Sequence, residues 1–176
     1  ISSGVDWNES VETAYDHSLG PLFCSQLLQN HSAELPQDLR QAMQIHLNNH
    51  QLKASDLNAA LLEIISNLEN HNIAAIPFKG PTLSQRAFAD PTLRLFLDLD
   101  ILVQEADVEK SVAVLIEMGY RHEAHFSAVH EASVRRYGGQ YHMHNRATDV
   151  SVEPHWALTP STMAIDLDYS LWWSQA

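Results

Sequence analysis

The sequence is poor in the residues that would cross-link the chain or attract it to a polyanion. Cys24 is the single cysteine among 176 residues, which excludes an internal disulfide and fits a reducing cytoplasm. Lysine and arginine number 10 against 22 acidic residues, and the resulting formal net charge of −12 argues against a broad electrostatic grip on DNA or RNA. The sequence also lacks an apolar run of about 18 residues and a signal-peptide pattern. We therefore expect a cytoplasmic protein that neither binds long nucleic acids nor enters a membrane.

Length and composition are those of an ordinary globular domain. Hydrophobic residues make up 45% of the chain and charged residues 18%, which is enough to bury one core. We expect a helical N-terminal region over residues 1–72, a core over 73–158, and the start of a C-terminal helical region over 159–176. Because the chain opens at Ile1 without an initiator Met and closes on an apolar run, we expect it to be the N-terminal portion of a longer protein.

The N-terminal region has the apolar periodicity of helices. Residues 9–30 are predicted to be helical with an interruption at Gly20 and Pro21. A second helical stretch is predicted from Pro36 to about Asn72, with Ser55 as a candidate position for a break. Within it, apolar residues recur every three and four positions, which predicts a buried stripe.

The core alternates between strand and helix patterns. Strands are predicted over 73–77, 97–103 and 120–124, with a tight glycine turn and one short helix between the first two. Helices are predicted over 105–118, where Gly119 stands at the C′ position, and over 127–137. A hairpin is predicted with arms over 139–144 and 149–155.

Two aspartates on the second predicted strand are the first sign of chemistry. Because strand side chains alternate, Asp98 and Asp100 project the same way while Leu97, Leu99 and Ile101 project toward a core. Two like charges side by side cost stability unless a cation compensates, and hard oxygen ligands suit Mg²⁺ or Mn²⁺ bound together with phosphates. The alternative is an ordinary sheet with a solvated outer face.

The glycine turn upstream favours the metal-and-phosphate interpretation. Gly80 lets the main chain approach a ligand closely, and the helix that follows presents free N–H groups to an anion. Pro81 fits the first helical turn, where its missing N–H costs nothing.

This combination of motifs resembles the DNA polymerase beta-like nucleotidyltransferase superfamily. More narrowly, four segments resemble an uncharacterised bacterial nucleotidyltransferase-like family with a Lys-Gly, Arg and Asp-x-Asp pattern: Phe78-Lys79-Gly80-Pro81, Asp90-Pro91, Leu93-Arg94 and Asp98–Val103. The resemblance covers roughly residues 56–158. It implies an α+β nucleotidyltransferase fold, with a small mixed sheet, helices packed on one face and an N-terminal helical extension.

The resemblance also implies a third acidic residue on a later strand, just before a His-Trp pair. Glu153 stands there, followed by Pro154, His155 and Trp156, and we expect His155 and Trp156 to shape the strand end. The chain departs from the usual pattern at two positions: Pro81 stands where the superfamily has Gly or Ser, and Glu153 where Asp is more usual.

The predicted hairpin places polar residues beside Glu153. If residues 146–147 form a two-residue turn, His144 lies opposite Asp149, His142 opposite Ser151, and Gln140 opposite Glu153. One polar face then carries Glu153 with two histidines. These histidines could equally be exposed on a half-solvated hairpin.

The resemblance implies transfer of a nucleoside monophosphate from a nucleoside triphosphate to a hydroxyl group, with Mg²⁺ or Mn²⁺ as cofactor. Asp98, Asp100 and Glu153 are the expected catalytic residues and metal ligands, with Glu153 helping to take the proton.

Three further residues are expected to bind the nucleotide. Gly80 and its helix would cradle phosphate, while Lys79 and Arg94 would neutralise developing charge. Arg94 could instead pair with Asp90 as a loop clasp, and Lys79 could simply be solvated.

Two other functions remain open from the sequence. One is a catalytically inactive relative that binds a nucleotide or a protein, and the other is a zinc hydrolase that uses His142, His144 and nearby acids. For the leading hypothesis the acceptor stays open among a small metabolite, a protein hydroxyl and a tRNA end.

Overall fold

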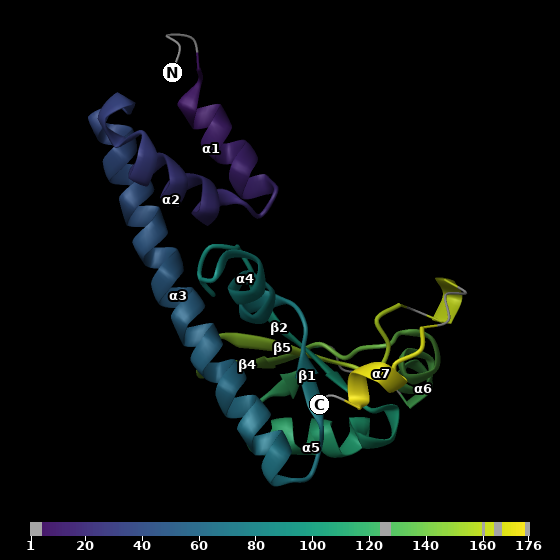
Figure 1. Ribbon diagram of the computed structural model, residues 1–176. Helices are drawn as coiled ribbons and strands as arrows, with labels where there is room; N and C mark the ends of the chain where they lie inside the picture. Colours follow the sequence, from purple (N-terminus) through teal and green to yellow (C-terminus); the bar gives the residue numbers. More distant parts are fainter. Residues whose placement is uncertain (1–4, 124–127, 160, 164–166, 175–176) are drawn as a thin grey trace. The chain divides into compact units, whose positions relative to one another are not determined.

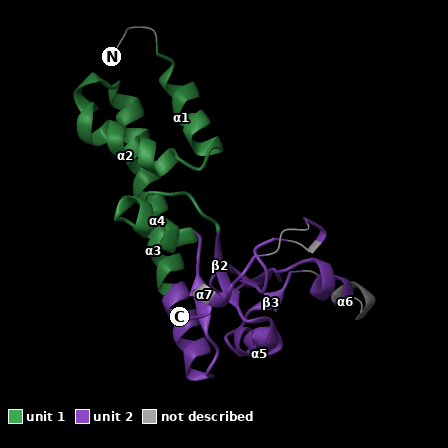
Figure 2. Cartoon of the chain, turned by 45° about the vertical axis from the view of Figure 1, so that its right-hand side comes forward, with its two compact units in different colours: residues 1–59, 80–97 green, residues 60–79, 98–176 purple. Residues whose placement is uncertain are grey.

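The computed structural model describes residues 5–123, 128–159, 161–163 and 167–174. The chain divides into two compact units, which are coloured separately in Figure 2. The helical unit comprises Ile1–Ala59 and Gly80–Leu97, and the sheet unit comprises Ala60–Lys79 and Asp98–Ala176. Of the predicted nucleotide-binding residues, Lys79 belongs to the sheet unit, and Gly80 and Arg94 belong to the helical unit.

The helical unit is built from short helices and the first part of a long one. Its elements are α1 (Trp7–Asp16), α2 (Gly20–Asn30), the 3-10 helix η1 (Ser32–Glu34), the start of α3 (Gln37–Asn70) and α4 (Gly80–Phe88), as Figure 1 shows. The side chain of Asp6 caps α1 by accepting hydrogen bonds from the backbone N–H groups of Asn8 and Glu9. The core of this unit contains Cys24, Leu27, Leu35 and Met43.

The predicted interruption between the first two helices is confirmed. The chain turns at Ser18, whose φ of 59° lies in the left-handed region, and α2 then begins at Gly20 with Pro21 in its first turn. A Cβ at Gly20 would lie 2.5 Å from the Tyr15 ring, so only glycine fits against this ring without a shift of the ring or the backbone.

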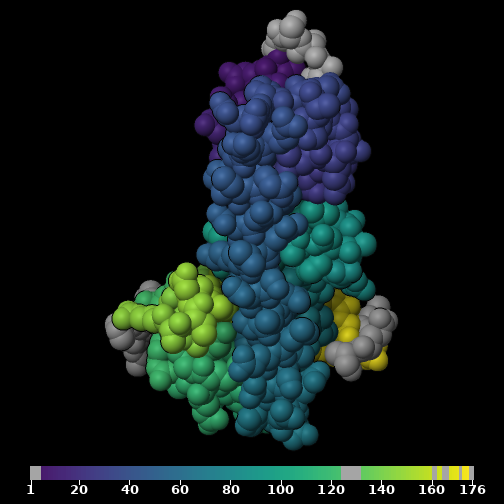
Figure 3. All heavy atoms as spheres, turned by 90° about the vertical axis from the view of Figure 1, so that its left-hand side faces the viewer, coloured from purple at the N-terminus to yellow at the C-terminus, as the bar shows by residue number. Residues whose placement is uncertain are grey.

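Helix α3 runs without interruption, and the break considered near Ser55 is therefore wrong. The stretch contains neither proline nor glycine, and its apolar stripe continues through Ser55 in regular spacing. The buried positions on both sides of Ser55 are Met43, Leu47, Ala54, Leu57, Leu61, Ile64 and Leu68. Figure 3 shows another long side of α3 open to view, in keeping with the exposure of Leu52 and Leu62. None of the described helices combines the length and apolar composition needed to cross a membrane.

The sheet unit contains a mixed five-stranded sheet in the order β1-β2-β5-β4-β3. The strands are β1 (Ala75–Pro77), β2 (Asp98–Val103), β3 (Arg121–His122), β4 (Met143–Asn145) and β5 (Val150–His155). β2 and β5 pair in parallel, and every other neighbouring pair is antiparallel. The α+β class and the small mixed sheet predicted from the sequence are thus confirmed.

Helix α5 (Val108–Glu117) lies along one face of this sheet and packs against β5 (Figure 1). It follows the 3-10 helix η2 (Glu105–Asp107), and it ends as predicted with Gly119 at C′, where φ is +96°. The Asn145 side chain donates a hydrogen bond to the Met118 carbonyl at 3.2 Å, which ties this helix end to β4.

The remaining elements are α6 (Ala128–Tyr137), the 3-10 helix η3 (Ser161–Met163) and α7 (Ser170–Trp173). Predicted boundaries at Ala124 and at residue 127 lie outside the described residues, as do the last two residues of the apolar C-terminal run.

The predicted hairpin forms between β4 and β5, but its predicted register is wrong. His144 pairs with Ser151 and Met143 with Val152, so the loop spans residues 146–149 instead of two residues. The Asn145 side chain accepts a hydrogen bond from the Ala147 N–H, and Asp149 adopts a φ of 56°, which together favour the longer turn. Because the shift is by two positions, the polar side chains remain on the predicted face.

Candidate metal centre

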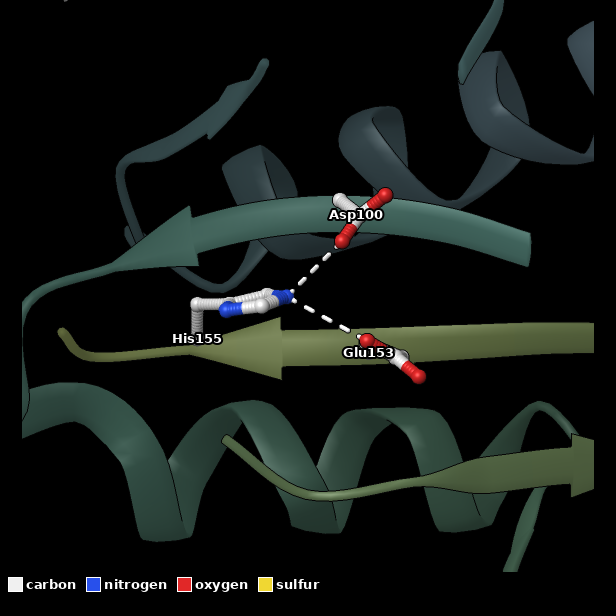
Figure 4. A group of neighbouring side chains, drawn as sticks. All are labelled: Asp100, Glu153 and His155. Atoms are coloured by element: carbon white, nitrogen blue, oxygen red, sulfur yellow. Dashed lines mark hydrogen bonds and ion pairs between the residues drawn. The ribbon is translucent and has the colours of Figure 1, made fainter. Parts of the chain in front are cut away.

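The centre of the candidate site is the parallel pair of β2 and β5. Asp100 pairs with Glu153, and Leu102 pairs with His155. Since strand side chains alternate, Asp98 and Asp100 share a face of the sheet with Glu153 and His155. Two segments more than fifty residues apart in sequence are thereby brought side by side (Figure 4).

The side chains of Asp100, Glu153 and His155 converge on one point. His155 Nε2 lies 2.9 Å from Asp100 Oδ1 and 3.5 Å from Glu153 Oε2. Figure 4 shows the imidazole directed at both carboxylates from the end of β5. One donor atom from each of the three residues lies within 4.8 Å of the others. The side chains of Asp100 and His155 are 2% and 4% exposed, so this group is largely shielded from water.

Lys79 approaches the same group from the end of β1. Its Nζ lies 2.7 Å from Asp100 Oδ1, and the Phe78 N–H donates to the Asp100 carbonyl at 3.3 Å. The Phe78 ring meets the His155 ring edge-on, with centroids 5.0 Å apart. The Lys79 side chain is 47% exposed, whereas that of its partner Asp100 is 2% exposed, so the ion pair joins a buried carboxylate to a partly solvated side chain.

Glu153 is held from the hairpin side. Gln140 Nε2 donates to Glu153 Oε2 at 2.7 Å, and His142 Nδ1 lies 2.5 Å from Glu153 Oε1. His144 instead contacts Ser151 and Asp149. Among the described residues, the group that could hold a metal therefore includes neither His142 nor His144, the pair on which the zinc hydrolase hypothesis depends.

The charges of the group influence one another. Burial raises the pKa of Asp98, and the negative charges of Asp100 and Glu153 raise it further. Burial alone would also raise the pKa of Asp100, but hydrogen bonds from His155 and Lys79 outweigh it and lower that pKa.

Glu153 and His155 follow the same logic. Burial would raise the pKa of Glu153, but its hydrogen bond with His155 and the nearby charge of His142 lower it. Burial would lower the pKa of His155, but the carboxylates of Asp100 and Glu153 raise it. The site therefore keeps Asp100 and Glu153 ionised and concentrates negative charge on one face of the sheet.

This donor set fits a divalent cation. Carboxylate oxygens bind Mg²⁺ and Mn²⁺, and imidazole nitrogen binds first-row transition metals. Asp98 stands one strand repeat before Asp100 on the same face, but it is outside the group of mutually close donor atoms.

The other predicted nucleotide-binding residues belong to the helical unit. Gly80 begins α4 with a φ of 51°, and the Arg94 N–H donates to Ser84 Oγ at 3.1 Å. In place of the alternative clasp between Asp90 and Arg94, the Asp90 carboxylate accepts hydrogen bonds from the backbone N–H and the hydroxyl of Thr92, each at 2.7 Å.

His155, the last residue of β5, is the site residue whose proximity to the acids was not predicted from the sequence. It was expected to shape the strand end, yet its imidazole lies within the candidate metal group. The signal that could have revealed it is its position two residues after Glu153, since such neighbours on a strand project to the same face.

Comparison with known proteins agrees with this geometry. The model of a family described as uncharacterised nucleotidyltransferase matches residues 3–176. No curated protein and no solved structure matches the chain. Since the family model spans almost the whole sequence, the chain belongs to the uncharacterised nucleotidyltransferase family.

Proposed function

We propose that this protein is a metal-dependent nucleotidyltransferase that moves a nucleoside monophosphate from a nucleoside triphosphate to a hydroxyl group of an acceptor. The observation that carries the proposal is the pairing of Asp100 with Glu153 on adjacent parallel strands, in a chain of a nucleotidyltransferase family. Lys79 and His155 offset part of the charge of this acidic pair in the metal-free protein, and a divalent cation bound by the two carboxylates would offset it further.

Asp98, Asp100 and Glu153 are the proposed metal ligands and catalytic residues. Divalent ions bound there, Mg²⁺ or Mn²⁺, would offset the charge of the triphosphate and lower the pKa of the acceptor hydroxyl. The acceptor oxygen forms a bond to the α phosphorus, the bond from that phosphorus to the bridging oxygen breaks, and pyrophosphate leaves. Glu153, already close to two histidines, is the proposed recipient of the hydroxyl proton.

The remaining predicted residues bind the triphosphate in this proposal. The Lys79 side chain is half-exposed and its ammonium group lies next to Asp100, so it is suited to meet a phosphate that arrives from solvent. Gly80, at the first turn of the nine-residue helix α4, and Arg94 are proposed to contact phosphate oxygens.

Thermal unfolding tests binding. A nucleoside triphosphate with Mg²⁺ or Mn²⁺ at about 100 times its Kd is expected to stabilise the protein by about 2.7 kcal/mol. For a chain of this length, that corresponds to a rise in Tm of roughly 5–11 °C. The double variant Asp98→Asn with Asp100→Asn should lose the shift, while Asp149→Asn, whose side chain is 82% exposed, should keep it. Indifference of the wild type to all four nucleotides with either metal would refute the proposal.

Transfer must be tested separately from binding. Incubation with each of the four triphosphates, labelled at the α phosphate, and a cell lysate is expected to label one acceptor and release pyrophosphate. Nucleotide binding without any label transfer would favour the alternative, a catalytically inactive relative that binds a nucleotide or a protein. The chemical class of the labelled product identifies the acceptor as a small molecule, a protein or an RNA.

A further inference from the structure

We infer that His155 is a direct ligand of the catalytic divalent ion, and that the site therefore favours first-row transition metals over Mg²⁺. This inference rests on the proposed function, because it needs an ion bound between Asp100 and Glu153. It adds an imidazole nitrogen to the carboxylate ligands of the proposed function.

The two distances from His155 to the carboxylates match those between ligands of a single ion. Ligand atoms about 2.1 Å from a metal lie about 3.0 Å apart at a right angle and about 3.5 Å apart at a tetrahedral angle. His155 Nε2 lies 2.9 Å from the Asp100 oxygen and 3.5 Å from the Glu153 oxygen. The imidazole nitrogen therefore lies at ligand spacing from both carboxylates, and all three donor atoms lie within 4.8 Å of one another.

His155 has little freedom to avoid such an ion. Its side chain is 4% exposed, its ring packs edge-on against Phe78, and its backbone pairs with Leu102 across the parallel strands. Lys79 differs, because its side chain is 47% exposed and its ammonium group can withdraw into solvent. An ion that displaces Lys79 from Asp100 would therefore still meet the imidazole nitrogen.

The chemistry of this nitrogen determines the metal preference. Mg²⁺ is a hard ion that takes oxygen ligands and keeps several waters, whereas imidazole suits iron, zinc and related metals. A carboxylate in the place of His155 would bind Mg²⁺ without such discrimination. The burial of the imidazole also makes its replacement by a water ligand unfavourable.

Pulsed electron paramagnetic resonance of the Mn²⁺-loaded chain tests direct ligation. We expect a nitrogen coupling of directly bound imidazole, which changes when the histidines are labelled with ¹⁵N. His155→Gln should abolish it. His142→Gln is the matched control and should retain it, because His142 also contacts Glu153 but lies outside the close donor group. Bound Mn²⁺ without this coupling in the wild type would overturn the inference, whatever the variants do.

Metal selectivity supplies a second measurement. In competition experiments, His155→Gln should lower the ratio of the Mn²⁺ affinity to the Mg²⁺ affinity by roughly tenfold or more. The reason is that an amide oxygen replaces the imidazole nitrogen. An unchanged ratio would also overturn the inference. If the wild type binds an ion without a nitrogen ligand, the inference fails but the proposed function stands. If the wild type binds no divalent ion, with or without nucleotide, both the inference and the proposed function fail.

Discussion

Replacement of Asp98 by asparagine is expected to change the stability of the protein in opposite directions without and with a divalent ion. Burial and the charges of Asp100 and Glu153 raise the pKa of Asp98, while Lys79 partly offsets them. The ionised carboxylate therefore costs folding free energy in the metal-free protein. Asparagine keeps the shape of the side chain and removes this cost.

The size of the effect follows from the strand geometry. Same-side neighbours on a strand are roughly 6.5–7 Å apart. Two charges at that distance repel by about 2.5 kcal/mol at an effective dielectric constant of about 20. Because Asp98 is half-buried and Lys79 lies nearby, solvent screening and the opposite charge reduce the net gain to about 1 kcal/mol. For 176 residues, this predicts a rise in Tm of roughly 2–4 °C without metal.

The pH dependence has a defined sign. The pKa of Asp98 in the folded protein lies above its ordinary value of 3.8. The penalty is therefore complete at neutral pH, decreases as the pH falls through the folded pKa, and vanishes below 3.8, where Asp98 is protonated in both states. The advantage of the Asp98→Asn variant should disappear over the same range.

Calorimetric unfolding in EDTA and in excess Mn²⁺ measures the effect of Asp98→Asn on the metal-free and on the metal-bound protein. With metal the wild type should gain more stability than the variant, because Asp98 contributes negative charge near the ion. Asp149→Asn is the matched control, since its carboxylate is 82% exposed and lies 3.7 Å from His144 Nε2. The reasoning is refuted if the Asp98 variant is less stable than the wild type in EDTA, or if Mn²⁺ stabilises both proteins equally.

Three further predictions concern other parts of the chain. Lys79→Met, which removes the ammonium 2.7 Å from Asp100, is expected to weaken triphosphate binding roughly tenfold in calorimetric titration; an unchanged Kd would mean that Lys79 is merely solvated. Gly119→Ala is expected to destabilise the protein by about 1–2 kcal/mol in urea unfolding, because φ is +96° and the added Cβ would lie 3.2 Å from an amide nitrogen; equal stability would contradict this explanation. Burial lowers the pKa of His50, so the unfolded chain takes up the proton first and stability should fall as the pH decreases through 6.5. His50→Leu should reduce that fall in urea unfolding at pH 7.5 and about pH 5.5. His17→Leu, a substitution at an exposed position, should leave that fall in stability unchanged. An equal pH dependence of stability in the two variants would count against the role of His50.

Much of the fold was predictable because it depends on rules that act over a few residues. The alternation of side chains along a strand predicted that Asp98 and Asp100 share a face of β2. The glycine at position 119 marked the end of α5, and the Gly20-Pro21 pair marked the start of α2. In each case the preference of the backbone is local, so the surrounding chain does not need to be known.

The register of the hairpin and the proximity of His155 to Asp100 were not predictable in this way. The four-residue loop is favoured by the Asn145 side chain and by the left-handed backbone of Asp149 instead of a glycine signal. Alternation along β5 places His155 on the same face as Glu153. Whether a further carboxylate or solvent lies beside that face depends on which strand pairs with β5. The histidine was therefore assigned to the strand end although its position was compatible with the site.

From its sequence alone, the chain could be assigned to its family, to the α+β class and to a strand that presents two acids on one side. Only the tertiary structure decided that β5 lies parallel and adjacent to β2, which brings His155 to within 2.9 Å of Asp100, 55 residues away. The physical reason is that residue periodicity determines which way a side chain points, whereas the choice of neighbouring strand depends on burying one common core.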